Sequence, residues 1–266
     1  MRRGGARDVR GEDLMKITVL GVALLALACN VPTYAAETRE QIYRIGADVD
    51  ATGRITATQL DADVPASIGS VVSAAVKQWH FVPARRDGQP VPAHTFVYTK
   101  LKAIPDTHGG YSLRISFEGN GPRMLKQNIQ PHYPMDAVRR RECAFVVLDA
   151  TVQPDGSLGD LSAHSRFDDW PLRSSFIGSV LAAAKQWHAI PEQVDGQPVA
   201  TRMHLSASFT LNEPIFTAKQ TRILNNYARE EAADNAQPGI PLPSDQTLAL
   251  DSPLKPNAVA TITNAP

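Results

Sequence analysis

Apolar and polar positions follow one regular succession in the second half of this chain. Residues 144–152 (AFVVLDATV) are mostly apolar and β-branched, which predicts a β-strand. The turn sequence QPDG follows at 153–156, with Pro and Gly where a tight turn needs them. Residues 157–165 then predict a second strand, so that the two strands form a hairpin.

A helix is predicted after this hairpin, beginning at Pro171. Its apolar residues have the spacing of one helix face with a period of 3.6: Phe176, Val180, Leu181, Ala184 and Trp187. Pro191 ends the helix because proline cannot continue it. An Asp-Gly turn follows, and the alternation over 199–211 predicts a final strand.

The same succession occurs a second time, nearer the N-terminus. The sequence AAVKQWHFVPARRDGQPV at 74–91 closely matches AAAKQWHAIPEQVDGQPV at 182–199. The hairpin turns match as well, since VDATGRI at 49–55 corresponds to VQPDGSL at 152–158. Two such matches, one with a tryptophan in each copy, indicate an internal duplication.

The first copy therefore has the same predicted elements as the second. Matched residues are 108 apart at Trp79 and Trp187 but 103 apart at the turns, Gly53 and Gly156. The second copy thus carries five extra residues, which we place in the loop 165–171. The elements expected in the first copy are strands at 42–50, 54–62 and 91–103 and a helix at 67–80.

The predicted fold class is α+β, with two tandem small antiparallel β-sheet domains (β-hairpin, helix, strand), each covered by a helix. A three-stranded sheet has one apolar face that a single helix can cover, and it leaves sheet edges unpaired, which are places where another strand can bind. The residues expected in the structural core recur in the two copies: Trp79, Pro83, Trp187, Pro191 and Gly196.

The chain divides into five predicted segments. A start extension and signal peptide (1–35) precedes the first, degenerate copy. A linker that includes an extra strand at 111–118 leads to the second copy, and a helix at 219–231 is followed by a tail that we expect to be disordered from Asp234 because of its Pro, Ala, Asn, Ser and Thr content. The first copy spans 36–104, the linker 105–126, the second copy 127–213, and the helix with its tail 214–266.

The N-terminus has the features of an export signal. Met15 and Lys16 precede the apolar run ITVLGVALLALA, which small residues follow. The run is shorter than the roughly 20 apolar residues that span a bilayer. Three outcomes stay open: cleavage before Ala36, lipidation of Cys29, or an uncleaved anchor. In each the folded part lies outside the cytoplasm, in the periplasm, and the true start is either Met1 or Met15.

Composition and short motifs exclude several classes of function. The formal net charge is zero with 20% charged residues, which is typical of a globular protein and gives no reason to expect nucleic acid as a partner. Two cysteines exclude a disulfide framework, and Cys143 is expected to be a small buried apolar residue. The seven histidines show no metal-ligand spacing, and no nucleophile elbow or phosphate-binding loop occurs. We therefore predict no metal, no cofactor and no enzymatic activity.

The motifs of the second copy together resemble the C-terminal domain of the TonB family. The sequence QPHYPMDA at 130–137 matches the opening of that domain, and Asp155-Gly156 matches its hairpin turn. The close is matched by WHAIP at 187–191 and GQPV at 196–199. The first copy has WHFVP at 79–83 but no Tyr-Pro opening, so it resembles a degenerate copy of the same domain.

This resemblance implies a periplasmic protein that captures an extended peptide segment of an outer-membrane transport receptor by strand addition. Family members that transduce energy have a long anchor and a Pro-rich spacer, which this sequence lacks. An envelope adaptor or structural protein is therefore the alternative, and self-association stays open; membrane association would come only from the signal anchor or from lipidation of Cys29. Tyr133 and Pro134 have a second interpretation, which is that they fix a helix start. The resemblance implies these peptide-binding residues: Gln130, Pro131, Tyr133, Pro134, Arg202, His204 and Ser206.

Overall fold

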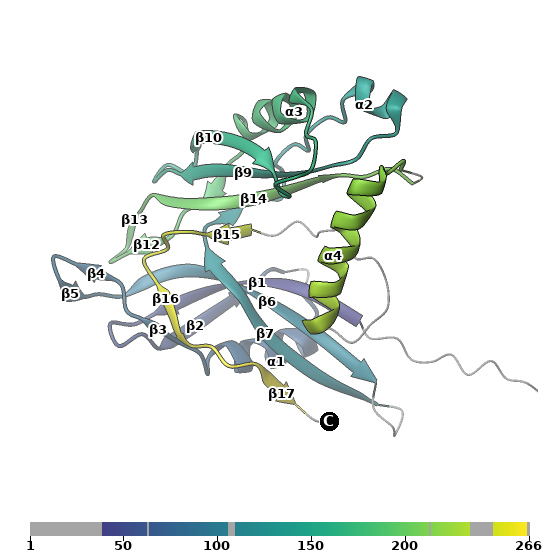
Figure 1. The fold of residues 1–266 in the computed structure, drawn as a ribbon. Coiled ribbons are helices and arrows are strands. Elements are labelled where there is room, and N and C mark those ends of the chain that lie inside the picture. The colour runs from purple at the N-terminus through teal and green to yellow at the C-terminus, as the bar shows by residue number, and fades with distance from the viewer. Residues whose placement is uncertain (1–38, 63, 106–109, 213, 235–246, 265–266) are drawn as a thin grey trace, which may run out of the picture. The chain divides into compact units, whose positions relative to one another are not determined.

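The computed structural model describes residues 39–62, 64–105, 110–212, 214–234 and 247–264 (Figure 1). In this part of the chain no helix is long and apolar enough to cross a membrane. The predicted start extension and signal peptide, with Met15, Cys29 and the three outcomes for its processing, lie outside the described residues.

The first repeat (residues 39–105) has the predicted order of strand, strand, helix, strand. These elements are β1 (Arg39–Val49), β2 (Ile55–Leu60), α1 (Ala66–Val76) and β6 (Ala93–Pro105). Strand β1 lies between β2 and β6 and pairs with both in the antiparallel sense. Helix α1 buries Val72, Ala75 and Val76, so its apolar stripe faces the core. Three short strands join the helix to β6: β3 (His80–Val82), β4 (Arg85–Arg86) and β5 (Gln89–Pro90).

The second repeat (residues 144–209) has the same order. Its elements are β9 (Ala144–Val152), β10 (Leu158–Ser165), α3 (Ser174–Ala184) and β14 (Thr201–Phe209), with β9 between β10 and β14. Figure 1 shows α3 on one face of this sheet, where it buries Phe176 and Val180. Three short strands again follow the helix: β11 (Ala189–Ile190), β12 (Gln193–Val194) and β13 (Gln197–Pro198).

The hairpin turns show how closely the two repeats agree. Gly53 has φ +86° and Gly156 has φ +85°, a region that favours glycine. The amide of Phe81 donates to the carbonyl oxygen of Gly53, and the amide of Ala189 donates to that of Gly156. Hairpin pairing keeps the 103-residue offset as far as Ala163, which pairs with Leu148 as Leu60 pairs with Ile45. The five extra residues therefore lie between Ala163 and α3, which agrees with the predicted loop.

The predicted helices are too long at their C-terminal ends. Helix α1 ends at Val76 and α3 at Ala184, each followed by a tightened turn that leads to the tryptophan. Trp79 is buried at 1% exposure, and Trp187 is partly buried against the core of the second repeat. Pro83 and Pro191 are half-buried, whereas Gly196 is exposed, so its predicted place in the core is wrong. Gly196 instead supplies the positive φ of +72° at a turn.

The segment between the repeats adds more than the predicted strand. Strand β7 (Tyr111–Gly121) is longer than expected and pairs along β6. Strand β8 (Arg123–Met124) pairs with β11. An extended segment then leads to the short helix α2 (Met135–Arg140), which ends at Arg141 with a left-handed φ of 54°.

The C-terminal tail corrects another prediction. Helix α4 (Ala218–Asp234) is present as expected, and residues 235–246 lie outside the described part. The disorder predicted from Asp234 onward is wrong for residues 247–264. These residues form β15 (Thr247–Ala249), β16 (Lys255–Ala258) and β17 (Ile262–Asn264), which pair with β14, β3 and β7 (yellow in Figure 1). The polar composition of the tail did not predict these strands, because their partners are edges of strands elsewhere in the fold. Leu254 provides a buried anchor at 1% exposure.

The described chain is thus a mixed α/β protein with antiparallel sheets and few helices. The two repeats also share a sheet, because β12 of the second repeat pairs with β6 of the first. The division into two tandem domains stays a prediction.

Candidate functional site

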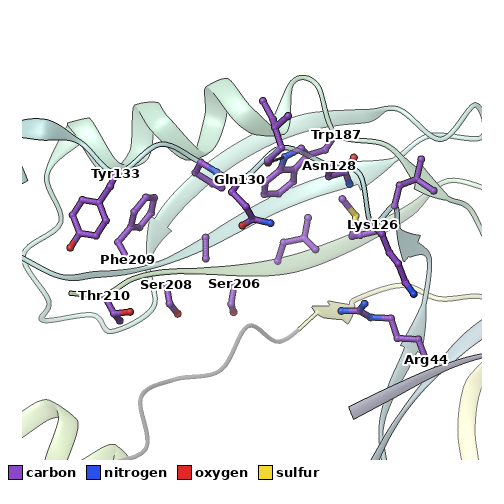
Figure 2. A pocket seen from close by; sticks show the side chains of 16 residues that line it. Arg44, Lys126, Asn128, Gln130, Tyr133, Trp187, Ser206, Ser208, Phe209 and Thr210 are labelled. Carbon is purple, nitrogen blue, oxygen red and sulfur yellow. Dashed lines mark hydrogen bonds between the residues drawn. The ribbon is translucent and has the colours of Figure 1, made fainter. Parts of the chain in front are cut away.

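A groove of about 640 Å³ lies between the extended segment 124–133 and strand β14 (Figure 2). Four of the predicted peptide-binding residues line it: Gln130, Pro131, Tyr133 and Ser206. Figure 2 shows Ser206, Ser208 and Thr210 in a row along one side of β14, with Gln130, Tyr133 and Trp187 on the other side. The structure therefore brings together residues from two of the motifs singled out in the sequence.

Hydrogen bonds fix the first wall of the groove, the segment 128–133. The Trp187 indole Nε1 donates to the carbonyl oxygen of Ile129 at 2.7 Å. The side-chain amide of Asn128 donates from Nδ2 to the His188 carbonyl oxygen at 2.8 Å. Its Oδ1 accepts from the main-chain N–H of His188 at 2.9 Å. The Ser179 hydroxyl donates to the His132 carbonyl oxygen at 2.5 Å. Gln130 lies between these anchors with its side chain exposed, which leaves its amide group available to a ligand.

Tyr133 lies at the end of this wall and is held from both sides. Its hydroxyl donates to the Glu142 carbonyl oxygen at 2.6 Å, and its ring makes edge contacts with Phe176 and Phe209. Burial raises the pKa of the Tyr133 hydroxyl, so the side chain is a neutral donor at physiological pH. Pro134 immediately precedes α2 and lines a different cavity of about 310 Å³, in agreement with a role in starting that helix.

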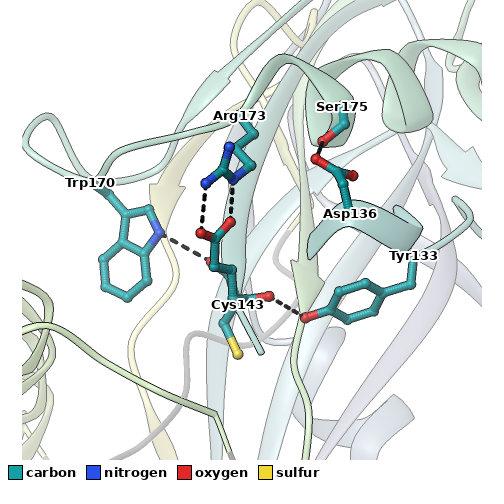
Figure 3. Close-up of polar contacts among 7 residues, drawn as sticks. Tyr133, Asp136, Cys143, Trp170, Arg173 and Ser175 are labelled. Carbon is teal, nitrogen blue, oxygen red and sulfur yellow. Dashed lines mark hydrogen bonds and ion pairs between the residues drawn. The ribbon is translucent and has the colours of Figure 1, made fainter. Parts of the chain in front are cut away.

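Arg173 and Glu142 form a polar brace next to Tyr133 (Figure 3). Arg173 donates from Nε and Nη2 to both carboxylate oxygens of Glu142, and this contact lowers the pKa of Glu142. The Trp170 indole donates to the Cys143 carbonyl oxygen at 3.4 Å. Burial raises the pKa of the Cys143 thiol, which fits the predicted small apolar residue.

The second wall is the edge of β14 that faces away from β9. The Leu250 amide donates to the Arg202 carbonyl oxygen at 2.8 Å, so the main-chain groups of Arg202 face this edge. Because main-chain direction repeats every two residues in a strand, those of Ser206 and Thr210 face it as well. Among the described residues, β15 pairs with this edge only at 203–205. The edge of β14 beyond Leu205 therefore adjoins the groove. It lies next to the part of the same edge that pairs with β15.

Two predicted binding residues on β14 do not line the groove. The Arg202 guanidinium and main-chain amide both bind the Asp251 carboxylate, at 2.8 and 2.6 Å. His204 lies 2.8 Å from Asp149, measured from Nε2 to Oδ1. The C-terminal segment and the neighbouring strand thus engage these two side chains, and their role in peptide binding stays a prediction.

Sequence reasoning missed two cationic residues that line the groove. Arg44 comes from β1 in the first repeat, and Lys126 comes from the segment between the repeats. Lys126 Nζ also lies 3.1 Å from Asp61. None of the described residues that line the groove is acidic. No local motif could identify Arg44, because the fold alone brings the first repeat to this place. Among the described residues, no cluster of His, Cys, Asp or Glu is arranged to hold a metal ion.

Comparison with known proteins supports the resemblance for the second repeat. Residues 129–211 match the sequence model of the C-terminal domain of the Gram-negative bacterial TonB protein. The match begins at the first wall of the groove and ends just after β14, so it contains most of the site. The first repeat lies outside the matched residues. No curated protein matches the chain significantly.

Proposed function

We propose that this chain, whose residues 129–211 belong to the TonB C-terminal family, is a periplasmic binding protein that captures an extended peptide by strand addition. The peptide would lie in the groove beside β14 and come from an outer-membrane transport receptor. Main-chain hydrogen bonds to the strand edge supply affinity in this mode of binding, and the groove walls select side chains.

The observation that carries this proposal is the edge of β14 beyond Leu205. Strand β15 pairs with residues 203–205, and the main-chain groups of Ser206 and Thr210 face the same side. An incoming strand would continue the sheet from that point. Gln130, on the fixed wall 128–133, would contact the peptide from the other side of the groove.

The first repeat provides an internal example of such an added strand. Strand β6 matches β14 in the duplication, and residues 96–105 of β6 pair with β7 on the side away from β1. Residues 98–102 of β6, which correspond to 206–210 of β14, pair with β7 residues 114–119. Strand β7 thus has the position on the first repeat that we assign to the peptide on the second.

The charged residues of the groove predict one feature of the bound peptide. Arg44 and Lys126 line the groove, and none of the described residues that line it is acidic, while Lys126 also pairs with Asp61 just outside it. We expect a bound peptide to place an acidic side chain toward these two residues. Their contribution should be small in affinity and sensitive to salt, because Arg44 is exposed.

The proposal is tested with synthetic peptides from the periplasmic N-terminal segments of the outer-membrane receptors encoded in the same genome. Binding is measured by fluorescence anisotropy with the wild type and with S206P and S206A variants. Proline at 206 removes an N–H on the side of β14 that faces away from β9, and it leaves the bonds to β9 in place. We expect S206P to weaken binding by about tenfold or more, the value of at least one hydrogen bond, and S206A to change it little.

Circular dichroism of the same samples controls for folding. Equal binding by folded S206P and wild type would contradict strand addition at this edge. If S206P does not fold, Q130A serves as the second variant, because Gln130 is exposed and its loss should weaken binding without affecting stability. Failure of all receptor peptides, together with binding of extended segments from other envelope proteins, would favour the adaptor function.

A further inference from the structure

Two extended segments hold equivalent places in the two repeats. In the second repeat, β8 pairs with β11, with Met124 opposite Ala189. In the first repeat, β16 pairs with β3, with Pro256 opposite Phe81. Phe81 matches Ala189 in the duplication, and both pairings are antiparallel. The C-terminal residues 255–258 therefore have the position on the first repeat that residues 123–124 have on the second.

The two tryptophans confirm this equivalence a few residues further along. The Trp187 indole donates to the carbonyl oxygen of Ile129, five residues after Met124. The Trp79 indole donates to the carbonyl oxygen of Ala260, four residues after Pro256, at 2.9 Å. Both extended segments thus run in the same direction from the paired strand to the tryptophan. They reach it from different parts of the sequence, since one lies directly before its repeat and the other at the C-terminal end.

The C-terminal segment is anchored in the interior as a ligand would be. Leu254 is buried at 1% exposure within the same core cluster as Trp79 and Phe81. The Asn120 side-chain amide donates to the Ser252 hydroxyl at 2.7 Å and to the Leu254 carbonyl oxygen at 3.1 Å. An apolar anchor combined with satisfied polar contacts is what holds an added strand in place.

We propose that residues 252–262 are the first repeat's own strand ligand, a separable segment that completes this repeat in the place that residues 123–131 have on the second repeat. The first repeat has no Tyr-Pro opening of its own in the sequence, and the C-terminal segment supplies the extended strand that residues 123–129, just before this opening, supply in the second repeat. Another extended peptide can then pair with β3 only if residues 252–262 leave it. This inference does not depend on the proposed function, because it concerns the other repeat.

The test uses hydrogen exchange, followed by mass spectrometry, in the full chain carrying L254D. A charge at this buried position should release the segment, so the amides of β3 should exchange about tenfold faster or more. The amides of β11 provide an internal control and should not change. The matched control variant is L250D, since Leu250 lies in the same segment but is 41% exposed.

A synthetic peptide of residues 250–264 provides the second half of the test. Added to the L254D chain, it should restore the protection of β3, whereas the same peptide with Asp at position 254 should not. Unchanged exchange at β3 in folded L254D would overturn the proposal, and so would failure of the wild-type peptide to restore protection.

A cleavable full chain keeps the proposal testable if L254D does not fold. A protease site is inserted between residues 240 and 241, and the cleaved chain is unfolded and refolded with an excess of fluorescently labelled peptide 250–264. We expect the label to be retained and β3 to be protected. A refolded chain that keeps β3 protected without any bound label or tail would show that the segment is not the ligand of this repeat.

Discussion

The Thr95 hydroxyl donates to the Glu192 carboxyl group at 2.5 Å and joins the first repeat to the second. Two further hydroxyls donate to the same carboxyl group, from Thr201 at 3.0 Å and from Ser252 at 2.7 Å. Glu192 has no exposed surface, and the matching residue of the first repeat is Ala84. Within the described residues no cationic side chain pairs with Glu192, so this buried junction of both repeats and the C-terminal segment depends on hydroxyl groups.

This environment predicts a pH dependence of stability. Burial raises the pKa of Glu192, so the native state retains this proton at a pH where the unfolded chain, with a pKa of about 4.3, has lost it. Stability therefore falls as the pH rises above that value. E192Q removes the titration and keeps an acceptor for Thr95 and Ser252. We expect the free energy of unfolding of E192Q, measured in urea, to rise relative to the wild type between pH 4.5 and 7.

The control is E192A, which also removes the titration but leaves three buried hydroxyls without their acceptor, so relative to E192Q it should cost about 1–3 kcal/mol at every pH tested. A constant difference between E192Q and the wild type from pH 4.5 to 7 would show that the pKa of Glu192 is not raised in the native state.

The turn glycines predict a second, matched effect in the two repeats. A Cβ atom at Gly53 would lie 1.9 Å from the Phe81 carbonyl oxygen, and one at Gly156 would lie 2.4 Å from that of Ala189. Both also have positive φ, so G53A and G156A should each destabilise by about 1–3 kcal/mol or more. The control is G178A in α3, where nothing lies within 4 Å, and this change should stabilise by up to about 1 kcal/mol. Chemical denaturation measures all three, and wild-type stability in G53A would contradict the close contact.

The duplication explains why the sequence predicts much of the fold. Two copies of one pattern fix each other's boundaries, so β9 agrees with its predicted bounds and Gly53 and Gly156 coincide as turns. The helix ends were less predictable because Trp79 and Trp187 continue the apolar spacing of the helix. The chain leaves the helix before them, and the strands β3 and β11 begin one and two residues after the respective tryptophan.

The remaining features depend on long-range contacts that leave no local pattern. Strands β15 to β17 form only because edges of distant strands accept them, and their composition is that of a disordered tail. The candidate site divides in the same way. Gln130 and Tyr133 stand in a motif and Ser206 in the predicted final strand, whereas Arg44 reaches the groove from the first repeat. Arg202 was predicted to bind peptide, but the tail supplies Asp251 as its partner.

The brace between Arg173 and Glu142 predicts the opposite pH response. The Arg173 contact lowers the pKa of Glu142, so its stabilising effect is present above the unfolded pKa of about 4.3 and is lost as the pH falls. R173L should destabilise the protein only slightly at pH 7, because both side chains are partly exposed. We expect this difference to shrink below pH 4 in chemical denaturation. A difference that persists at pH 3 would mean that packing of the Arg173 stem, rather than its charge, supports the loop.

The equivalent tryptophans allow the two repeats to be tested separately. In W187F the Ile129 carbonyl oxygen loses its donor, which should loosen the wall 128–133 and weaken peptide binding in the groove. In W79F the Ala260 carbonyl oxygen loses its donor, which should speed exchange in β3 and leave the groove unchanged. Trp79 is the more buried of the two and makes an edge contact with Phe117 at 5.5 Å, so W79F should cost more stability, about 1–3 kcal/mol. Hydrogen exchange and peptide anisotropy on both variants distinguish these effects, and a loss of peptide binding in W79F equal to that in W187F would show that the repeats do not act independently.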